Sequence, residues 1–255
     1  MSDPSSKEAI KQYAIRLGDD ALVLGHRLSE WCSNAPFLEE DLALTNVSLD
    51  FIGRARMFYT YAAEIDGGDF TENSYAYQRD CREFSNLLIH ELPRGDFAFS
   101  MARQYLVDEF SLPYMERLQD SADETLAAIA AKAVKESRYH LRRSRDWMLR
   151  LGDGTAESHD RLQSALDDLW GYTPEMFDMD ALEQELVAAG IAVDSAALQA
   201  DWKQAVTATF GEASIQVPET AWQIKGGRQG MHTESLGHLL SELQFVQRAY
   251  PGLEW

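Results

Sequence analysis

Long stretches of helical periodicity, arranged as two consecutive pairs, constrain the fold of this chain most strongly. Along the first stretch apolar residues recur at intervals of three and four, at Ile10, Tyr13, Leu17, Ala21, Leu24, Leu28 and Trp31. This spacing predicts one buried stripe along a helix that ends before Pro36. A second helix is expected over about 38–64, before the Asp66-Gly67-Gly68-Asp69 turn.

The second pair covers about 97–118 and 124–151, and either Ser121 or Asp123 can cap its second helix. A shorter helix is expected between the pairs, over about 75–90. Because a short turn joins the helices of each pair, the sequence predicts a four-helix bundle.

Beyond the bundle the periodic segments become shorter. Helices are expected near 158–171, 180–189 and 195–210, followed by an irregular stretch that includes residues 226–230, and a last helix runs from Thr233 to about Arg248. The glycines at 226, 227 and 230 lack a preceding strand and a following Lys-Ser/Thr pair, so they predict a turn rather than a phosphate-binding loop.

No Pro/Gly/Ser-rich linker divides the 255 residues, and 45% of them are hydrophobic, enough for a sizeable core. We therefore expect a single all-α domain over residues 1–255. Its bundle core would cover about 5–151, and an extension of further helices and an irregular segment would cover about 152–255.

The charge balance excludes several kinds of partner. Against 42 Asp and Glu residues the chain has 23 Lys and Arg, a net charge of −19 and a pI near 4.6. Such a field repels phosphate backbones and anionic lipids, so nucleic-acid and membrane partners are not expected. An anionic ligand such as a CoA thioester would need a local basic patch.

Cysteine use and the start of the chain indicate a cytoplasmic protein. Only Cys32 and Cys81 occur, which favours reduced thiols over a disulfide framework. The chain shows neither an apolar signal core after Met1 nor an apolar run of membrane-spanning length. We also find no Ser-His-Asp or Cys-His pattern that would indicate a hydrolase or transferase.

The two helix pairs carry acids at heights that can be calculated from the helical rise. If the first turn is centred near Ala35, Asp20 faces Asp50. A second turn centred between Ala122 and Asp123 places Asp108 opposite Ser137.

Ferritin-like di-metal bundles take one carboxylate from each of two helices and a Glu-x-x-His motif from each of the other two. Asp20 and Asp108 fit the single positions. On the second helix, however, Gly53 stands where a histidine is expected after Asp50, and no histidine occurs between His26 and His90.

The fourth helix keeps His140, but Ser137 precedes it by three residues and Glu136 by four. The acids and the one histidine that remain are too few to bind two irons. We therefore predict a ferritin-like core that holds no metal, with Asp20, Asp50, Gly53, Asp108, Ser137 and His140 as vestigial positions and with no catalytic or cofactor-binding residue.

Two alternatives stay open. The chain could bind iron itself, through Asp20, Asp50, Asp108, Glu136 and His140, or the mirrored acids could be ordinary polar positions. If inward acids hold no metal they need cationic or hydrogen-bonding partners, because an unpaired buried carboxylate is costly. Nearby candidates are Arg54, Arg56 and Arg138.

Four segments resemble the C subunit of the bacterial phenylacetyl-CoA epoxidases: residues 17–31 (LGDDALVLGHRLSEW), 41–56 (DLALTNVSLDFIGRAR), 135–140 (KESRYH) and 227–237 (GRQGMHTESLG). The resemblance extends over nearly the whole chain. It implies a structural ferritin-like subunit that pairs with a homologous di-iron catalytic subunit, and the six positions above are then vestiges of a site.

The resemblance further implies a multicomponent monooxygenase that forms the ring-1,2-epoxide of phenylacetyl-CoA with O2. A small bridging subunit, and a reductase subunit that uses NADPH, would complete the complex. Such a subunit would support the helices of its partner. Some aromatic residues could anchor that interface, although core packing is the simpler role for them. They are Phe58, Tyr59, Tyr61, Trp147 and Trp170.

Two further patterns have ordinary explanations. Arg138, Arg142 and Arg145 share a helical stripe that could meet CoA phosphates or an acidic partner, although a solvated face paired with neighbouring acids is the simpler interpretation. The set His232, Glu234, His238 and Glu242 resembles metal ligands, but helix capping and surface exposure explain it equally well.

Overall fold

The computed structural model describes residues 4–219 and 222–253, and within these ranges the regular structure is entirely helical. The chain divides into two compact units. Unit 1 contains residues 1–30, 43–93 and 226–255, and unit 2 contains residues 31–42 and 94–225. This division does not follow the expected boundary near residue 151, since the last segment belongs with the first helix. The single domain stays a prediction.

Unit 1 is built on α1 (Pro4–Ser29) and most of α2 (Leu38–Asp66), close to the predicted helices. All seven apolar residues of the predicted stripe are buried. Short elements follow: α3 (Glu72–Tyr77), the 3-10 turn η1 (Cys81–Glu83) and α4 (Leu88–Glu91). The regular periodicity of α1 therefore produced the buried face that it predicted.

The register of α1 against α2 differs from the expected one. Ser48 Oγ donates a hydrogen bond to the Gly25 carbonyl oxygen (2.7 Å), and a Cβ on Gly25 would lie 3.2 Å from Phe51 Cβ. Because the two helices are antiparallel, Asp20, five residues before Gly25, lies beside a part of α2 that follows Phe51. The pairing of Asp20 with Asp50 is therefore wrong by about one helical turn. The connection between α1 and α2 is not helical, so its rise per residue is not constant. The positions of residues along the two helices therefore cannot be calculated by counting residues from the centre of the turn.

The helix expected over 75–90 is not formed. Between α3 and α4 the chain is largely extended, with η1 as its only regular turn. The backbone N–H groups of Ser85 and Leu87 donate to the carboxylates of Asp19 and Asp20 on α1. Because these donors serve side chains of another helix, the segment gives up its own helical hydrogen bonds.

The last helix of unit 1 is broken in two. Thr233 is the N-cap of α10 (Glu234–Leu243), and α11 (Phe245–Ala249) follows after Gln244. The buried Gln244 side chain donates to the carbonyl oxygens of Ala76 and Arg79. Leu236, Leu239 and Leu240 form the buried face of α10, and Leu243 is half-buried.

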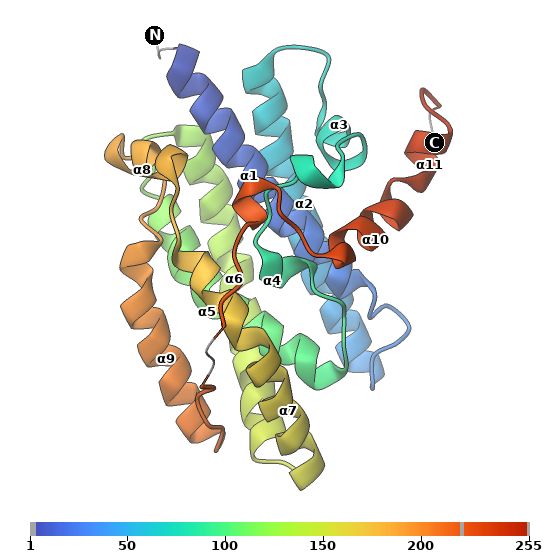
Figure 1. Ribbon diagram of the computed structural model, residues 1–255, viewed down its shortest axis with the longest axis vertical. Coiled ribbons are helices and arrows are strands. Elements are labelled where there is room, and N and C mark those ends of the chain that lie inside the picture. Colours follow the sequence, from blue (N-terminus) through green and yellow to red (C-terminus); the bar gives the residue numbers. More distant parts are fainter. Residues whose placement is uncertain (1–3, 220–221, 254–255) are drawn as a thin grey trace. The chain divides into compact units, whose positions relative to one another are not determined.

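Unit 2 is a group of packed helices: α5 (Phe97–Leu118), α6 (Glu124–Gly152), α7 (Ala156–Leu169) and α9 (Gln199–Glu212) (Figure 1). Asp123, one of the two expected caps, accepts from the Leu126 N–H. Phe97 and Trp147, which are equally far from Ala122 along the chain, meet edge to face at 4.8 Å. This contact agrees with the expected register of α5 against α6.

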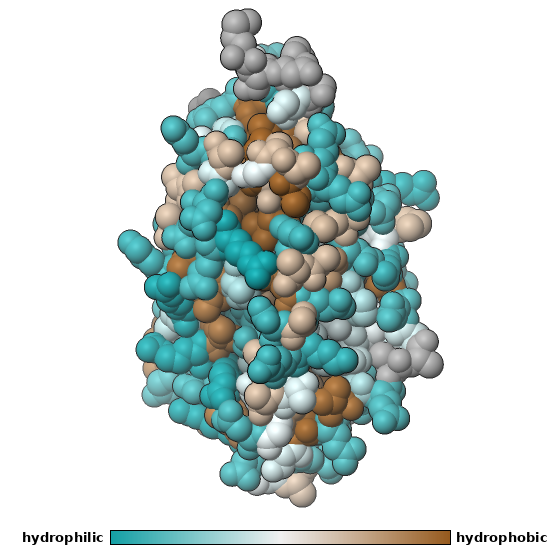
Figure 2. Space-filling view, turned by 90° about the vertical axis from the view of Figure 1, so that its left-hand side faces the viewer, coloured by the Kyte–Doolittle hydropathy of each residue, from teal (hydrophilic) through white to brown (hydrophobic). Residues whose placement is uncertain are grey.

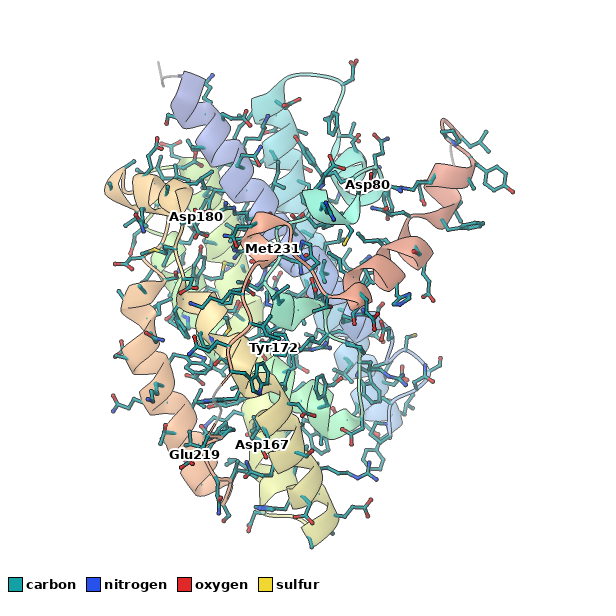
Figure 3. All side chains as sticks on the ribbon, viewed as in Figure 1. Asp80, Asp167, Tyr172, Asp180, Glu219 and Met231 are labelled. Atoms are coloured by element: carbon teal, nitrogen blue, oxygen red, sulfur yellow. The ribbon has the colours of Figure 1, made fainter. Side chains whose placement is uncertain are left out.

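The remainder of unit 2 covers the helices with shorter elements: the 3-10 helices η2 (Trp170–Phe177) and η3 (Ala196–Leu198) and α8 (Ala181–Ala188). Asp180, labelled in Figure 3, caps α8 by accepting from the Glu183 N–H. The irregular stretch after α9 returns along η2, where the ring of Trp222 meets Tyr172 at 5.5 Å.

No helix in the described ranges is both long and apolar enough to span a membrane. On the face shown in Figure 2, hydrophobic side chains reach the surface as separate patches among hydrophilic ones. Several of the aromatic residues considered as interface anchors pack internally instead. Phe58 and Tyr59 are buried, and Trp170 contacts Trp202 and Phe210.

Candidate functional site

The predicted site residues are divided between the two units. Asp20, Asp50 and Gly53 belong to unit 1, and Asp108, Ser137 and His140 belong to unit 2.

In unit 1 the Asp20 carboxylate is bound on both oxygens. Arg228 donates to Oδ2 (2.8 Å) and Oδ1 (3.1 Å), and the Leu87 N–H (2.7 Å) and His90 Nδ1 (3.2 Å) also contact Oδ1. Burial by itself would raise the pKa of Asp20, but the charge of Arg228 and the hydrogen bond to His90 outweigh it and lower the pKa to about 2. Asp20 is therefore a carboxylate that this chain itself neutralises.

The adjacent Asp19, missed by the sequence analysis, is fully buried and more completely bound. Its oxygens accept from Arg79, from the Tyr59 hydroxyl (2.6 Å) and from the Ser85 N–H (2.8 Å). The Arg79 guanidinium also lies 4.1 Å from the ring centroid of Phe84. Burial raises the pKa of Tyr59, so its hydroxyl keeps the proton that it donates.

A third buried carboxylate, Glu91, joins the C-terminal segment to this cluster. His232 Nδ1 lies 2.7 Å from Oε2, and the Thr233 N–H donates to Oε1 (2.5 Å). The Asn86 amide also donates to Oε2 (2.9 Å). The second ring nitrogen of His232 lies 2.8 Å from the Phe84 carbonyl oxygen. Both nitrogens thus face acceptors, which favours the imidazolium.

Gly227 allows the C-terminal segment to pack directly against the backbone at Asn86. A Cβ on Gly227 would lie 2.1 Å from the Asn86 carbonyl oxygen. Arg228 follows directly and reaches Asp20, while Arg27 of α1 donates to the carbonyl oxygens of Glu91 and Ser235. The expected turn at residues 226–230 therefore positions side chains of a buried ionic cluster.

The unit 2 positions are buried too. Asp108 accepts from Gln104 Nε2 (2.7 Å) and Ser144 Oγ (2.8 Å), and Ser137 and His140 are buried on α6. Side chains lean toward the N-terminus of their helix, which explains why Asp108 meets Ser144 although Ser137 is closer to its height.

Two of the three cations expected to neutralise the inward acids pair with other carboxylates. Arg56 pairs with Glu72 (3.4 Å) and Arg138 with Glu116 (2.9 Å). Arg54 is buried, and its guanidinium lies 4.9 Å from the Phe51 ring centroid.

The donor sets do not fit a di-iron centre as they stand. Over residues 4–219 and 222–253, no three His, Cys, Asp or Glu side chains form a group that could hold a metal ion. To bind iron, Asp20 would have to release Arg228, and Asp108 would have to release Gln104 and Ser144. Gly53, where a ligand was expected, is half-buried, and a Cβ there would meet no atom within 4 Å. That the chain binds no iron stays a prediction.

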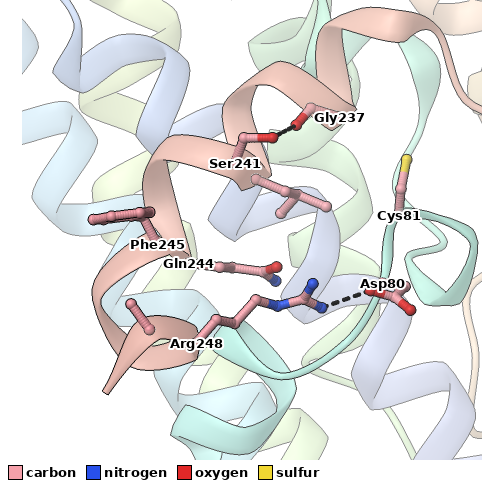
Figure 4. Close-up of a pocket in the computed structure, with 9 residues that line it drawn as sticks. Asp80, Cys81, Gly237, Ser241, Gln244, Phe245 and Arg248 are labelled. Atoms are coloured by element: carbon pink, nitrogen blue, oxygen red, sulfur yellow. Dashed lines mark hydrogen bonds and ion pairs between the residues drawn. The ribbon is translucent and has the colours of Figure 1, made fainter. Parts of the chain in front are cut away.

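The second metal-like set is not a ligand cluster. His232 points into the ionic cluster, whereas Glu234 and His238 are exposed. A pocket of about 530 Å³ lies beside α10 and is lined by residues that include Cys81 and Arg248. Figure 4 shows these side chains. Burial raises the pKa of the Cys81 thiol, and Asp80 accepts a hydrogen bond from Arg248 (2.6 Å).

These helices and bound carboxylates define an all-α protein of the ferritin-like class. Residues 1–255 match the protein family described as phenylacetic acid catabolic protein, and the chain belongs to that family. It is 49% identical over 243 residues to the C subunit of the 1,2-phenylacetyl-CoA epoxidase of Escherichia coli (strain K12), which covers 95% of this chain and 98% of the relative. The resemblance found in the sequence is confirmed.

The His232–Glu91 contact predicts a stability that depends on pH. Burial lowers the pKa of His232, but the hydrogen bonds to Glu91 and to the Phe84 carbonyl raise it more, so the net value lies above 6.5. Because the pKa of His232 is higher in the folded than in the unfolded chain, protonation stabilises the fold. This stabilisation is complete at a pH below the unfolded-state pKa and is lost as the pH rises through the folded-state pKa. We expect His232→Gln to remove that dependence.

Urea unfolding of wild type and His232→Gln from about pH 5.5 to about pH 8.5 measures this contribution. The difference in unfolding free energy should be largest at the acidic end. The exposed His238 provides the control, because His238→Gln should follow the wild-type profile. A wild-type profile parallel to that of His232→Gln would contradict the prediction.

Proposed function

We propose that this chain is the non-catalytic structural subunit of a multicomponent phenylacetyl-CoA ring-1,2-epoxidase in aerobic phenylacetate degradation. It would support a homologous catalytic subunit that carries the di-iron site. The observation that carries the proposal is the engagement of Asp20 by Arg228, His90 and Leu87. The similarity to a subunit of the Escherichia coli epoxidase supports the complex and the pathway.

The physical role follows from what the acids do. A catalytic bundle must hold its ligands within a fraction of an ångström, and rigid neighbouring helices reduce their motion. In unit 1, Asp19 pairs with Arg79 and Asp20 pairs with Arg228, and these two pairs fix α1 to two segments distant in sequence. Glu91 of α4 contacts His232 and so fixes the second of these segments further. Such a network gives α1 one fixed geometry, which suits a supporting surface better than a redox centre.

Iron loading tests the absence of a metal centre. We expect the isolated chain, after anaerobic Fe(II) loading and desalting, to retain well below one iron per chain by elemental analysis. The catalytic subunit loaded in parallel is the positive control. Retention near two irons per chain, lost in Asp108→Asn, would instead establish the alternative, a metal-binding ferritin-like oxygenase subunit that is itself catalytic.

A further inference from the structure

The exposed face of α6 is basic although the chain is strongly acidic. Lys135, Arg138, Tyr139 and Arg142 lie on this face over two helical turns, and we name them the α6 basic patch. The side chain of Arg138 is 64% exposed, and Tyr139 is 41% exposed. The patch lies wholly within unit 2.

Two of its cations are not neutralised within the chain. Across the part of the chain that the structure describes, neither Lys135 nor Arg142 forms an ion pair, whereas Arg138 pairs with Glu116 and Arg145 with Glu212. The Arg142 guanidinium lies 5.8 Å from the Tyr139 ring centroid. With 42 acids against 23 bases, a surface cation in this chain more readily meets an acid than another cation.

The acids on α6 leave the patch positive. Asp146 lies one turn beyond Arg142 on the same face, and Glu136 is half-buried on the flank. The exposed Arg150 adds a further cation at the C-terminal end of α6. The simple interpretation, a face paired with neighbouring acids, therefore holds for Arg138 and Arg145 but not for Lys135 and Arg142.

We propose that the α6 basic patch docks an acidic surface of another subunit of the complex, an inference that rests on the proposed function. Opposite potentials across an interface steer association and set its orientation. Tyr and Arg are also the residue types that dominate binding energy at interface centres. The exposed side of a helix is convex, which suits a protein surface better than a small ligand such as CoA, which needs a concave site.

Charge reversal tests the proposal. In Lys135→Glu/Arg142→Glu we expect association with one of the purified partner subunits (catalytic, bridging or reductase) to weaken about tenfold or more. Its dependence on salt between about 50 mM and about 300 mM should also flatten. Tyr139→Ala should weaken the same association without changing the salt dependence.

The control double variant, Arg161→Glu/Lys203→Glu, makes the same change in net charge on other exposed residues of unit 2. It should leave every association within about twofold of wild type. Equal losses in both double variants, or none in either, would refute the patch as a docking surface. So would CoA binding by the isolated chain that only the patch variant loses, because the occupant is then the nucleotide.

These outcomes are separable from the proposed function. If wild type forms no complex with the catalytic subunit, the proposed function fails, and the docking surface fails with it. If the complex forms and epoxidises phenylacetyl-CoA, but patch variants bind every subunit as wild type does, only the docking surface is refuted.

Discussion

Replacement of Arg79 by alanine should lower the free energy of unfolding by about 4 kcal/mol, because it leaves the buried Asp19 carboxylate without its cation. Asp19 is fully buried, so water cannot solvate its unpaired carboxylate. The substitution also removes hydrogen bonds that Arg79 donates to the carbonyl oxygens of Tyr75 and Glu83. The segment between α3 and α4 would then be attached to α1 mainly through the N–H groups of Ser85 and Leu87.

Urea unfolding followed by far-UV circular dichroism measures this effect. Arg161→Ala is the control, because its ion pairs are exposed and should contribute less than about 1 kcal/mol. If Arg79→Ala does not fold, Tyr59→Phe tests the same cluster by removing one donor to Asp19, at a cost of about 1–2 kcal/mol. A loss below about 1 kcal/mol in Arg79→Ala would contradict a buried ionic anchor.

The long helices could be predicted because their evidence is local. Apolar spacing located α1, α2, α5 and α6, and the Asp123 cap located the start of α6. The same spacing identified the buried stripe of α1. Both signals depend on residues within one or two turns of each other, so a single sequence contains them.

The ionic cluster could not be predicted in the same way, because its partners are far apart in the chain. Asp20 pairs with Arg228, and Asp19 pairs with Arg79, across loops whose geometry no local pattern gives. The expected helix over 75–90 failed for the same reason, since the N–H groups of Ser85 and Leu87 bind α1 instead. One available signal was the charged 227–237 segment, which the family resemblance singled out without assigning it a role.

Asp20 of α1 also shows why the calculated positions of acids along two helices are not enough to identify a metal site. A mirrored pair of acids indicates a metal site only if both point to one place and lack other partners. Asp20 meets neither condition, because it lies about one turn from the height of Asp50 and its oxygens already bind Arg228. The register expected for α5 against α6 agrees with the structure, whereas the register expected for α1 against α2 does not. That the remaining ligands hold no metal stays a prediction.

Replacement of Arg228 by alanine should destabilise the protein by about 3 kcal/mol, somewhat less than Arg79→Ala because the Asp20 side chain is 15% exposed. Asp20→Asn in the same chain should recover part of the loss, since a neutral amide needs no cation. A double-mutant cycle should therefore give a coupling energy of about 2 kcal/mol. Arg248→Ala, which removes an exposed pair with Asp80, is the matched control from the same C-terminal segment.

The pH dependence provides an independent check of this pair. Because the folded pKa of Asp20 is lowered to about 2, its contribution is complete above the usual value of 3.8 and is lost as pH falls through the folded value. Arg228→Ala should show a smaller loss at acidic pH, because only the contacts of His90 and the Leu87 N–H then remain, and Arg248→Ala should show the full loss. A coupling energy near zero, with parallel acid profiles, would show that Arg228 does not neutralise Asp20. Asp20 would then be available to a metal, and the structural role proposed for this subunit would lose its main support.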